Sequence, residues 1–310
     1  MTGRTARRRV LRISLPGDAA GAVTTTERAD FLAAEEPLGI RVGGEALALT
    51  MRTPGDDIDL AAGFLVSEGV VTSPDDIAGI VICSGERCGH AGHGASDHGA
   101  SDHGAADHGA AGDAGNIADV TLRPGLAVRP GLRRNFMTTS ACGVCGKTSI
   151  AELAATADLD LSADQARVRP AVLAGLPDAL RAAQRVFDRT GGLHAAGLFT
   201  AAGDLLAVRE DVGRHNAVDK IIGWALRTGR LPLAGCVLLV SGRASFELVQ
   251  KAVLAGIPVL AAVSAPSSLA ADLAQETGLT LVGFLRGGSM NVYTGQQRVV
   301  PAAQPAEIRG

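Results

Sequence analysis

The sequence predicts an α/β protein, because helical and strand patterns alternate along its C-terminal half. Apolar residues recur at helix or strand spacing in six consecutive segments: helices at 214–227, 245–255 and 267–277, and strands at 236–241, 257–263 and 279–284. This alternation is typical of parallel strands joined by right-handed helical crossovers. Gly256 and Gly278 stand where helix C-caps belong, which supports the boundaries between these segments.

The segment before this alternation predicts one more helix and a hairpin. Residues 177–190 have the spacing of an amphipathic helix that Gly191 and Gly192 would end. Residues 194–199 and 205–208 are typical of two antiparallel strands, because an Ala-Gly-Asp turn stands between them.

The N-terminal part predicts a smaller β-rich region. A hairpin at 38–42 and 46–51 is followed by a short helix that ends at Gly69 and by strands at 77–82 and 117–122. We therefore expect four parts along the chain: a basic disordered tail at 1–20, an N-terminal β-rich region at 21–136, a C-terminal α/β domain at 137–300 and a tail at 301–310.

Composition argues against several classes of protein. The formal net charge is −3 and only 3% of residues are aromatic, so we expect no nucleic-acid partner. Five cysteines are an odd number and no secretory signal precedes them, which predicts reduced thiols and a cytoplasmic location. Arg7, Arg8 and Arg9 lack the apolar segment that an export signal of the twin-arginine type requires. The apolar runs are too short to cross a bilayer, so no membrane span is expected.

Residues from about 88 to 115 form a low-complexity insertion of Gly, Ala, Asp and His. With few large side chains to bury, this segment cannot offset its ordering entropy, so we expect a disordered loop. Two interpretations of its histidines stay open, a neutral expanded repeat, which we favour, and a weak metal-binding tether: His90, His93, His98, His103 and His108.

Cys142 and Cys145 are the candidate catalytic residues. They form a Cys-x-x-Cys turn just before a helix-prone segment, with Lys147 close by, and such surroundings lower a thiol pKa. We expect Cys142 to carry sulfur as a persulfide and Cys145 to resolve it. The same motif also fits a structural zinc half-site or inert cysteines. Cys83 and Cys88 could complete a zinc site, but their spacing is loose, and we predict no metal.

A polar segment at 209–220 marks the expected junction between a strand and a helix. It contains charges of both signs beside a glycine, which favours a ligand-binding or catalytic role over a solvated helix start. Its candidate ligand contacts are Arg214, His215 and Asn216. His194 lies between apolar residues on a predicted strand and is more typical of a core histidine than of a ligand contact.

Two Gly- and Arg-containing loops follow predicted parallel strands and should meet at one edge of the sheet. Glycine allows backbone N–H groups to approach a phosphate, and arginine binds phosphate with two hydrogen bonds, so we expect an anionic ligand. The candidate residues in these loops are Gly242, Arg243, Ser245, Leu285, Arg286, Gly287, Gly288 and Ser289.

Together these motifs resemble the formate dehydrogenase accessory sulfurtransferase family, FdhD/NarQ. The resemblance covers nearly the whole chain outside the tail and the His-rich insertion. It rests on Glu36-Pro-Leu, Met51-Arg-Thr-Pro-Gly, Gly63-Phe-Leu-Val-Ser-Glu-Gly, Cys142-Gly-Val-Cys145-Gly-Lys, Gly192-Leu-His-Ala-Ala-Gly-Leu-Phe, Glu210-Asp-Val-Gly-Arg-His-Asn-Ala-Val-Asp-Lys, Ser241-Gly-Arg-Ala-Ser-Phe-Glu, Gly283-Phe-Leu-Arg and Asn291-Val-Tyr-Thr.

The resemblance implies a sulfurtransferase that serves formate dehydrogenase. Sulfur from a cysteine desulfurase would be received on Cys142 and passed to the bis-molybdopterin guanine dinucleotide form of the molybdenum cofactor. The resemblance also implies a mixed sheet with flanking helices similar to the cytidine-deaminase fold, a homodimer, and Phe284 packed on a ring of the cofactor.

Two functions from other classes share some of these features. Zinc-dependent deamination needs His-x-Glu ahead of Pro-Cys-x-x-Cys, whereas here His194 follows the cysteines and Ala141 precedes Cys142, so the ligand order and the general acid of a deaminase are both missing. A zinc-stabilised chaperone that only binds the cofactor would need the same pocket as a carrier, so the sequence leaves this alternative open.

Overall fold

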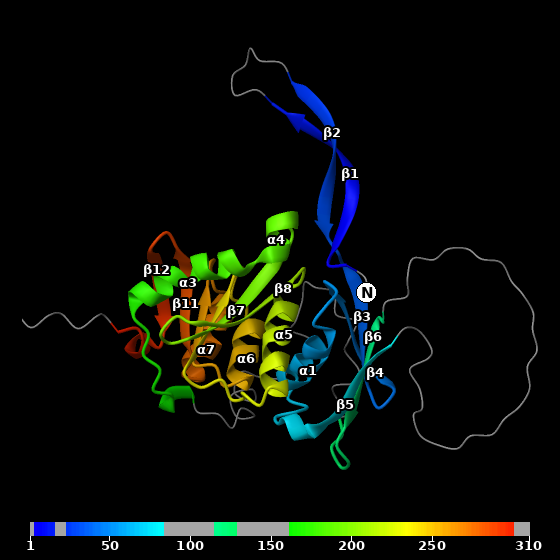
Figure 1. The fold of residues 1–310 in the computed structure, drawn as a ribbon. Helices are drawn as coiled ribbons and strands as arrows, with labels where there is room; N and C mark the ends of the chain where they lie inside the picture. Colours follow the sequence, from blue (N-terminus) through cyan, green and yellow to red (C-terminus); the bar gives the residue numbers. More distant parts are fainter. Residues whose placement is uncertain (1–2, 16–22, 84–114, 129–160, 301–310) are drawn as a thin grey trace, which may run out of the picture.

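Three β-sheets and their helices make up the part of the chain that the structure describes (Figure 1). The computed structural model describes residues 3–15, 23–83, 115–128 and 161–300. Cys142, Cys145, the His-rich insertion and the C-terminal tail lie outside these ranges. Within them, no helix is long and apolar enough to cross a membrane.

The largest sheet has six strands in the order β12-β11-β10-β9-β7-β8. Its central strands β9, β10 and β11 are parallel, whereas β7 pairs antiparallel with β8 and β9, and β12 with β11. This confirms the predicted α/β class, the parallel alternation and the hairpin. The strands are β7 (His194–Thr200), β8 (Leu205–Asp211), β9 (Cys236–Val240), β10 (Val259–Ala262), β11 (Thr280–Arg286) and β12 (Ser289–Thr294).

Helices cover both faces of this sheet because side chains alternate along each strand. On β9, Leu238 and Val240 contact the core formed with α5, α6 and α7, whereas Val237 and Leu239 contact the core formed with α3. The helices are α3 (Pro170–Ala183), α4 (Arg185–Thr190), α5 (Arg214–Arg227), α6 (Phe246–Leu254) and α7 (Ser268–Glu276). Short 3-10 turns lie at Pro74–Asp76, Leu161–Ala163 and Gln296–Arg298.

The helix predicted at 177–190 is wrong in its extent. Helix α3 begins at Pro170, contains Pro177 in its interior and ends at Ala183, and α4 begins separately after Gln184. Proline fits the first position of a helix because its missing N–H is unneeded there. Three buried leucines then face the sheet at helical spacing and hold the helix in place despite Pro177: Leu173, Leu176 and Leu180.

The N-terminal region contains a four-stranded sheet in the order β4-β3-β6-β5, as its predicted strands require. Its elements are β3 (Glu36–Val42), β4 (Glu45–Arg52), α1 (Asp57–Ser67), β5 (Ile77–Cys83) and β6 (Ile117–Leu122). One expectation here is wrong. Cys83 is disulfide-bonded, and its partner lies outside the described residues, so the expectation of only reduced thiols does not hold. Cys236 is free.

The predicted disordered tail at 1–20 is also wrong for its described part. Strand β1 (Thr5–Ser14) pairs antiparallel with β2 (Thr24–Ala33), and the pair projects from the body as a ribbon (Figure 1). Ten residue pairs of backbone register, from Thr5 with Ala33 to Ser14 with Thr24, hold the ribbon together. The sequence does not indicate this pairing, because backbone hydrogen bonds form it and no pattern of buried apolar side chains marks the two strands.

Helices α1 and α5 cross at two glycines, and this contact joins the N-terminal region to the large sheet. A Cβ added to Gly63 would lie 1.8 Å from the Asp219 carbonyl oxygen, and one added to Gly223 would lie 1.8 Å from the Asp59 carbonyl oxygen. The two backbones therefore approach more closely than any other residue type allows.

We expect Gly63→Ala to lower the free energy of unfolding by more than about 2 kcal/mol, because the added methyl group forces the helices apart. Gly175→Ala is the matched control, since Gly175 also lies inside a helix but an added Cβ meets nothing within 4 Å. Alanine is a better helix former there and should stabilise by up to about 1 kcal/mol. Urea unfolding measures both, and equal effects of the two variants would contradict the close crossing.

Candidate functional site

The loops that follow β9 and β10 and the end of β11 meet at one edge of the large sheet, as predicted. Backbone hydrogen bonds hold them side by side: Ser264 N–H donates to the Gly242 carbonyl at 3.2 Å, and Phe284 N–H donates to the Ser264 carbonyl at 3.1 Å. Ala244 N–H donates to the Ala265 carbonyl at 3.2 Å. The edge is therefore a continuous surface of backbone rather than three independent loops.

The start of α5 and the start of β7 reach the same edge. A Cβ added to Gly242 would lie 3.4 Å from the His194 ring and 3.9 Å from Arg214 Cδ, so the loop passes close to both side chains. His215 Nε2 lies 3.1 Å from Ser245 Oγ. The structure thus brings together the predicted residues Arg214, His215, Gly242 and Ser245, and it adds His194.

Arg214 is the uncompensated charge of this edge. Its Nε is buried without a hydrogen-bond partner, and among the described residues its guanidinium has no carboxylate within ion-pair distance. A buried N–H without an acceptor costs free energy unless a ligand supplies one. The orphaned N–H therefore marks a place for an anionic group.

The two histidines of the edge are neutral near pH 7. Burial lowers the pKa of His194, and Arg214 lowers it further, against an opposing effect of Asp211. Burial lowers the pKa of His215 to about 4, although Glu247 acts in the opposite direction. The 3.4 Å contact of His215 Nε2 with Glu247 is thus no ion pair at neutral pH. Ser245 and Glu247 contact the same ring nitrogen, so this is not a hydrolytic triad.

Ser245 occupies the N-cap position of α6 but makes no side-chain capping hydrogen bond. Serine at this position is typical of a helix cap, but the cap that the sequence predicts here is not formed. Its hydroxyl contacts His215 instead and ties the start of α6 to the start of α5.

The rest of the polar segment at 209–220 holds the edge in place. Lys220 Nζ lies 2.7 Å from Asp211 Oδ2 and donates to the Thr53 carbonyl at 2.8 Å, with both ionic side chains fully buried. The Asn216 amide donates to the Met51 carbonyl and to Asp211, and its oxygen accepts from a threonine hydroxyl. These bonds use both hydrogens of the Asn216 amide and give the side chain a positioning role, whereas its contact with a cofactor stays a prediction.

The segment 284–289 turns back on itself at the end of β11. Gly287 and Gly288 have φ of 58° and 78°, which allows a two-residue turn into β12. Phe284 has φ of 52°, a region that side chains rarely adopt, and the Arg286 guanidinium lies over its ring at 5.8 Å. Leu285 is fully buried in the core formed with α3. The exposed Ser289 hydroxyl donates to the Arg286 carbonyl.

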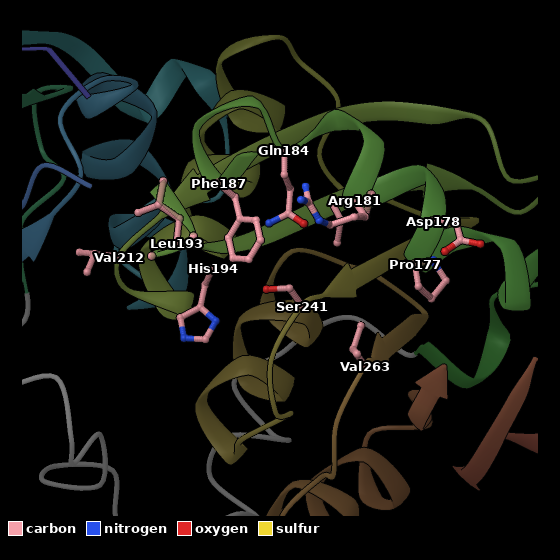
Figure 2. Close-up of a pocket in the computed structure, with 13 residues that line it drawn as sticks. Pro177, Asp178, Arg181, Gln184, Phe187, Leu193, His194, Val212, Ser241 and Val263 are labelled. Atoms are coloured by element: carbon pink, nitrogen blue, oxygen red, sulfur yellow. The ribbon is translucent and has the colours of Figure 1, made fainter. Parts of the chain in front are cut away.

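Arg243 and Arg286 are exposed at this edge and complete the predicted basic groups. A pocket of about 600 Å³ opens beside His194 and Ser241, between the sheet and helices α3 and α4 (Figure 2). Its other polar lining residues are Asp178, Arg181 and Gln184, which no sequence motif indicated because α3 and α4 lie outside the glycine- and arginine-rich loops.

The structure weakens one metal interpretation. Cys83 is engaged in a disulfide bond and cannot serve as a thiolate ligand of zinc in that state. In the part of the chain that the structure describes, no three His, Cys, Asp or Glu side chains are placed to hold a metal ion.

We expect His215→Gln to reduce the loss of stability in acid. Because the folded-state pKa of about 4 lies below the ordinary 6.5, the stability that neutral His215 contributes is present above pH 6.5 and is lost as pH falls toward 4. Between about pH 7.5 and about pH 5, wild type should lose about 2 kcal/mol more than the variant. Urea unfolding at both pH values measures this, and parallel losses would show that His215 is not held neutral.

Comparison with known proteins gives one consistent answer. A profile described as the FdhD/NarQ family matches residues 33–300. Sulfur carrier protein FdhD of Streptomyces avermitilis is 56% identical over 98% of each chain, and that of Streptomyces coelicolor is 58% identical over 95% of each. The crystal structure of a candidate formate dehydrogenase accessory protein from Desulfotalea psychrophila shares the fold, with TM-score 0.64 and 22% identity over 94% of this chain and 99% of the other. On these matches, the chain belongs to the FdhD/NarQ family.

Proposed function

We propose that the protein is a sulfur carrier required for formate dehydrogenase activity. It acts as a sulfurtransferase that takes sulfur from a cysteine desulfurase onto Cys142 and passes it to bis-molybdopterin guanine dinucleotide. The observation that carries the proposal is the combination of the family with Arg214, whose orphaned N–H lies at the glycine-lined edge. The relatives named above are sulfur carrier proteins.

The edge suits a client that carries pyrophosphate groups. Arg214 lacks a partner, Arg243 and Arg286 are exposed nearby, and the neutral histidines can donate or accept hydrogen bonds without adding charge. Arginine forms charge-assisted pairs with phosphate oxygens, and the glycines leave the backbone accessible. Residues 284–289 span the end of β11 and the turn into β12, where the Phe284 ring can pack against a flat group of the client.

The sulfur chemistry balances with thiols alone. The Cys142 thiolate attacks the outer sulfur of the desulfurase persulfide, a Cys142 persulfide forms, and the desulfurase thiolate leaves. The persulfide gives up its outer sulfur when the Cys145 thiolate attacks the Cys142 sulfur, which forms a disulfide and expels hydrosulfide toward the client. A dithiol reductant must reduce that disulfide before the next cycle.

The proposed function also implies which partners the protein has. A cysteine desulfurase supplies sulfur, formate dehydrogenase receives the finished cofactor, and the carrier acts in the cytoplasm as a homodimer. A zinc-stabilised chaperone without sulfur transfer is the alternative that the following experiment separates.

Incubation with a cysteine desulfurase and cysteine should add about 32 Da, the mass of one sulfur atom, to the intact protein. The gain should be reversed by a reductant and should vanish with Cys142→Ala. Cys236→Ala is the matched control and should keep the gain, because burial raises the pKa of the Cys236 thiol and leaves it protonated. Intact-mass spectrometry without zinc measures all three. No gain in any of them, together with tightly bound zinc that needs Cys142 and Cys145, would establish the chaperone instead.

A further inference from the structure

The ribbon of β1 and β2 leaves both of its outer edges open. The two strands form a sheet of their own, so among the described residues neither has a second neighbouring strand. Backbone N–H and C=O groups along each outer edge therefore face outward where the ribbon projects from the body (Figure 1). A two-stranded ribbon alone gains little stability in water, whereas a chain that pairs with an open edge adds main-chain hydrogen bonds. The ribbon is therefore suited to binding another protein.

The base of the ribbon is attached to the body on both strands. Just before β1, Arg4 Nη2 lies 2.6 Å from Asp56 Oδ2 at the start of α1. On β2, the Phe31 ring lies under the Arg189 guanidinium of α4 at 4.7 Å. The base therefore has a fixed position beside α4, and the distal half of the ribbon extends from there (Figure 1).

Apolar side chains gather at the distal end of the ribbon. Leu11 and Ile13 lie on one face and Arg12 on the other, because side chains alternate along a strand. Leu11 and Ile13 are each 59% exposed, and Leu15 and Val23, which follow toward the tip, are 77% and 58% exposed. Exposed apolar side chains that stand together are typical of a protein-binding surface.

The ribbon is basic, although the chain as a whole is acidic. Strands β1 and β2 contain five arginines and two carboxylates, a formal charge of +3 in a chain whose total is −3. Arg9 lies 3.6 Å from Glu27, and Arg28 lies 3.8 Å from Asp30. Among the residues that the structure describes, the other three arginines have no carboxylate within ion-pair distance: Arg7, Arg8 and Arg12. A complementary surface is therefore acidic around an apolar centre.

Two other classes of partner fit this surface less well. A lipid bilayer is disfavoured, because backbone groups without hydrogen-bond partners do not enter its hydrocarbon region. A nucleic acid is disfavoured, because Glu27 and Asp30 repel phosphates and the aliphatic distal end offers the bases no aromatic ring for stacking. The observations therefore favour a protein with an acidic surface.

The position of the base indicates which protein this is. Phe31 is paired with Arg7, so it lies on the same face of the ribbon as Leu11, and this face continues from the distal end to α4. A Cβ added to Gly192 would lie 3.6 Å from Ala33 Cβ, and Gly192 stands two residues before His194 of the sheet edge. A protein bound along this face therefore reaches the edge at which the client is proposed to bind.

We propose that the ribbon of β1 and β2 is the docking arm for the protein that receives the client, the cofactor-free formate dehydrogenase. Leu11 and Ile13 enter an apolar site on the dehydrogenase, and acidic residues around that site pair with the arginines of the ribbon. The proposal rests on the proposed function, because it assigns a surface of this chain to the recipient named there.

The test measures the affinity of the full-length protein for cofactor-free formate dehydrogenase of the same organism by biolayer interferometry. The double variant Leu11→Ser, Ile13→Ser should bind about tenfold more weakly or worse, because apolar side chains buried at the centre of an interface carry much of its binding free energy. Raising the salt concentration from about 0.05 M to about 0.5 M should weaken wild-type binding, because salt screens the attraction between arginines and carboxylates.

The double variant Leu49→Ser, Val81→Ser is the matched control. Leu49 and Val81 are also exposed on strands, at 49% and 63%, but they belong to the four-stranded sheet, so their replacement should leave the affinity unchanged. The ribbon variant should keep the wild-type melting temperature, because both of its replaced side chains are exposed. It should also keep the sulfur gain of about 32 Da on Cys142.

Equal affinity of wild type and the ribbon variant for the dehydrogenase would overturn the proposal, as would binding that salt leaves unchanged. Ribbon-dependent binding to phosphatidylglycerol vesicles in place of the dehydrogenase would assign the ribbon to a membrane surface and overturn it too. Sulfur loading of wild type, read by mass, separates these failures from failure of the proposed function. Loading on Cys142 with ribbon-independent docking removes only the present inference, whereas ribbon-dependent docking without loading removes the sulfur carrier and leaves a dehydrogenase-binding protein.

Discussion

The buried ion pair of Asp211 and Lys220 determines where the functional edge lies. Both side chains are fully buried, and they bind Thr53 from two sides: Lys220 donates to its carbonyl and Asp211 accepts from its N–H. Such a pair adds little net stability, but removing one partner leaves an unpaired buried charge. The pair therefore fixes the position of β4 against the junction of β8 and α5. Arg214 and His215 lie at the start of α5, directly after that junction, so the ion pair also fixes where these two residues lie.

A second buried ion pair involves the residue of α5 directly before Lys220. Lys251 on α6 contacts both carboxylate oxygens of Asp219 at 2.9 Å, and Ser67 at the end of α1 donates to the same carboxylate at 2.6 Å. Burial alone would lower the pKa of Lys251, but the carboxylates around it raise it, so the lysine stays charged. Three helices thus meet at one carboxylate. Beside it, the glycines of α1 and α5 bring the two backbones into contact.

The sequence could predict regular elements and loop chemistry but not long-range polar contacts. Helix α5 is found where apolar spacing predicted it, and the loop containing Gly242 lies at the expected edge, because both depend on local patterns. The ribbon of β1 and β2 was missed, since backbone pairing leaves little trace in a polar sequence. The contacts of Asn216 with Met51 and Asp211 could not be predicted, because a motif does not show whether an amide faces a ligand or the neighbouring sheet. No sequence motif indicates Gln184 as a pocket residue, because only the fold places it in the same pocket lining as Ser241.

Charge divides the candidate site into two neighbouring parts. At the edge, Arg214 keeps a positive charge that no described carboxylate neutralises, and burial keeps both histidines neutral. In the pocket, Arg181 is already paired with Asp188, and Gln184, His194 and Ser241 supply neutral donors and acceptors. An anionic group therefore gains most at the edge, because Arg214 is the cation that lacks a carboxylate partner among the described residues there. His194 lies at the boundary between the two parts, because it lines the pocket and its ring also stands next to Gly242.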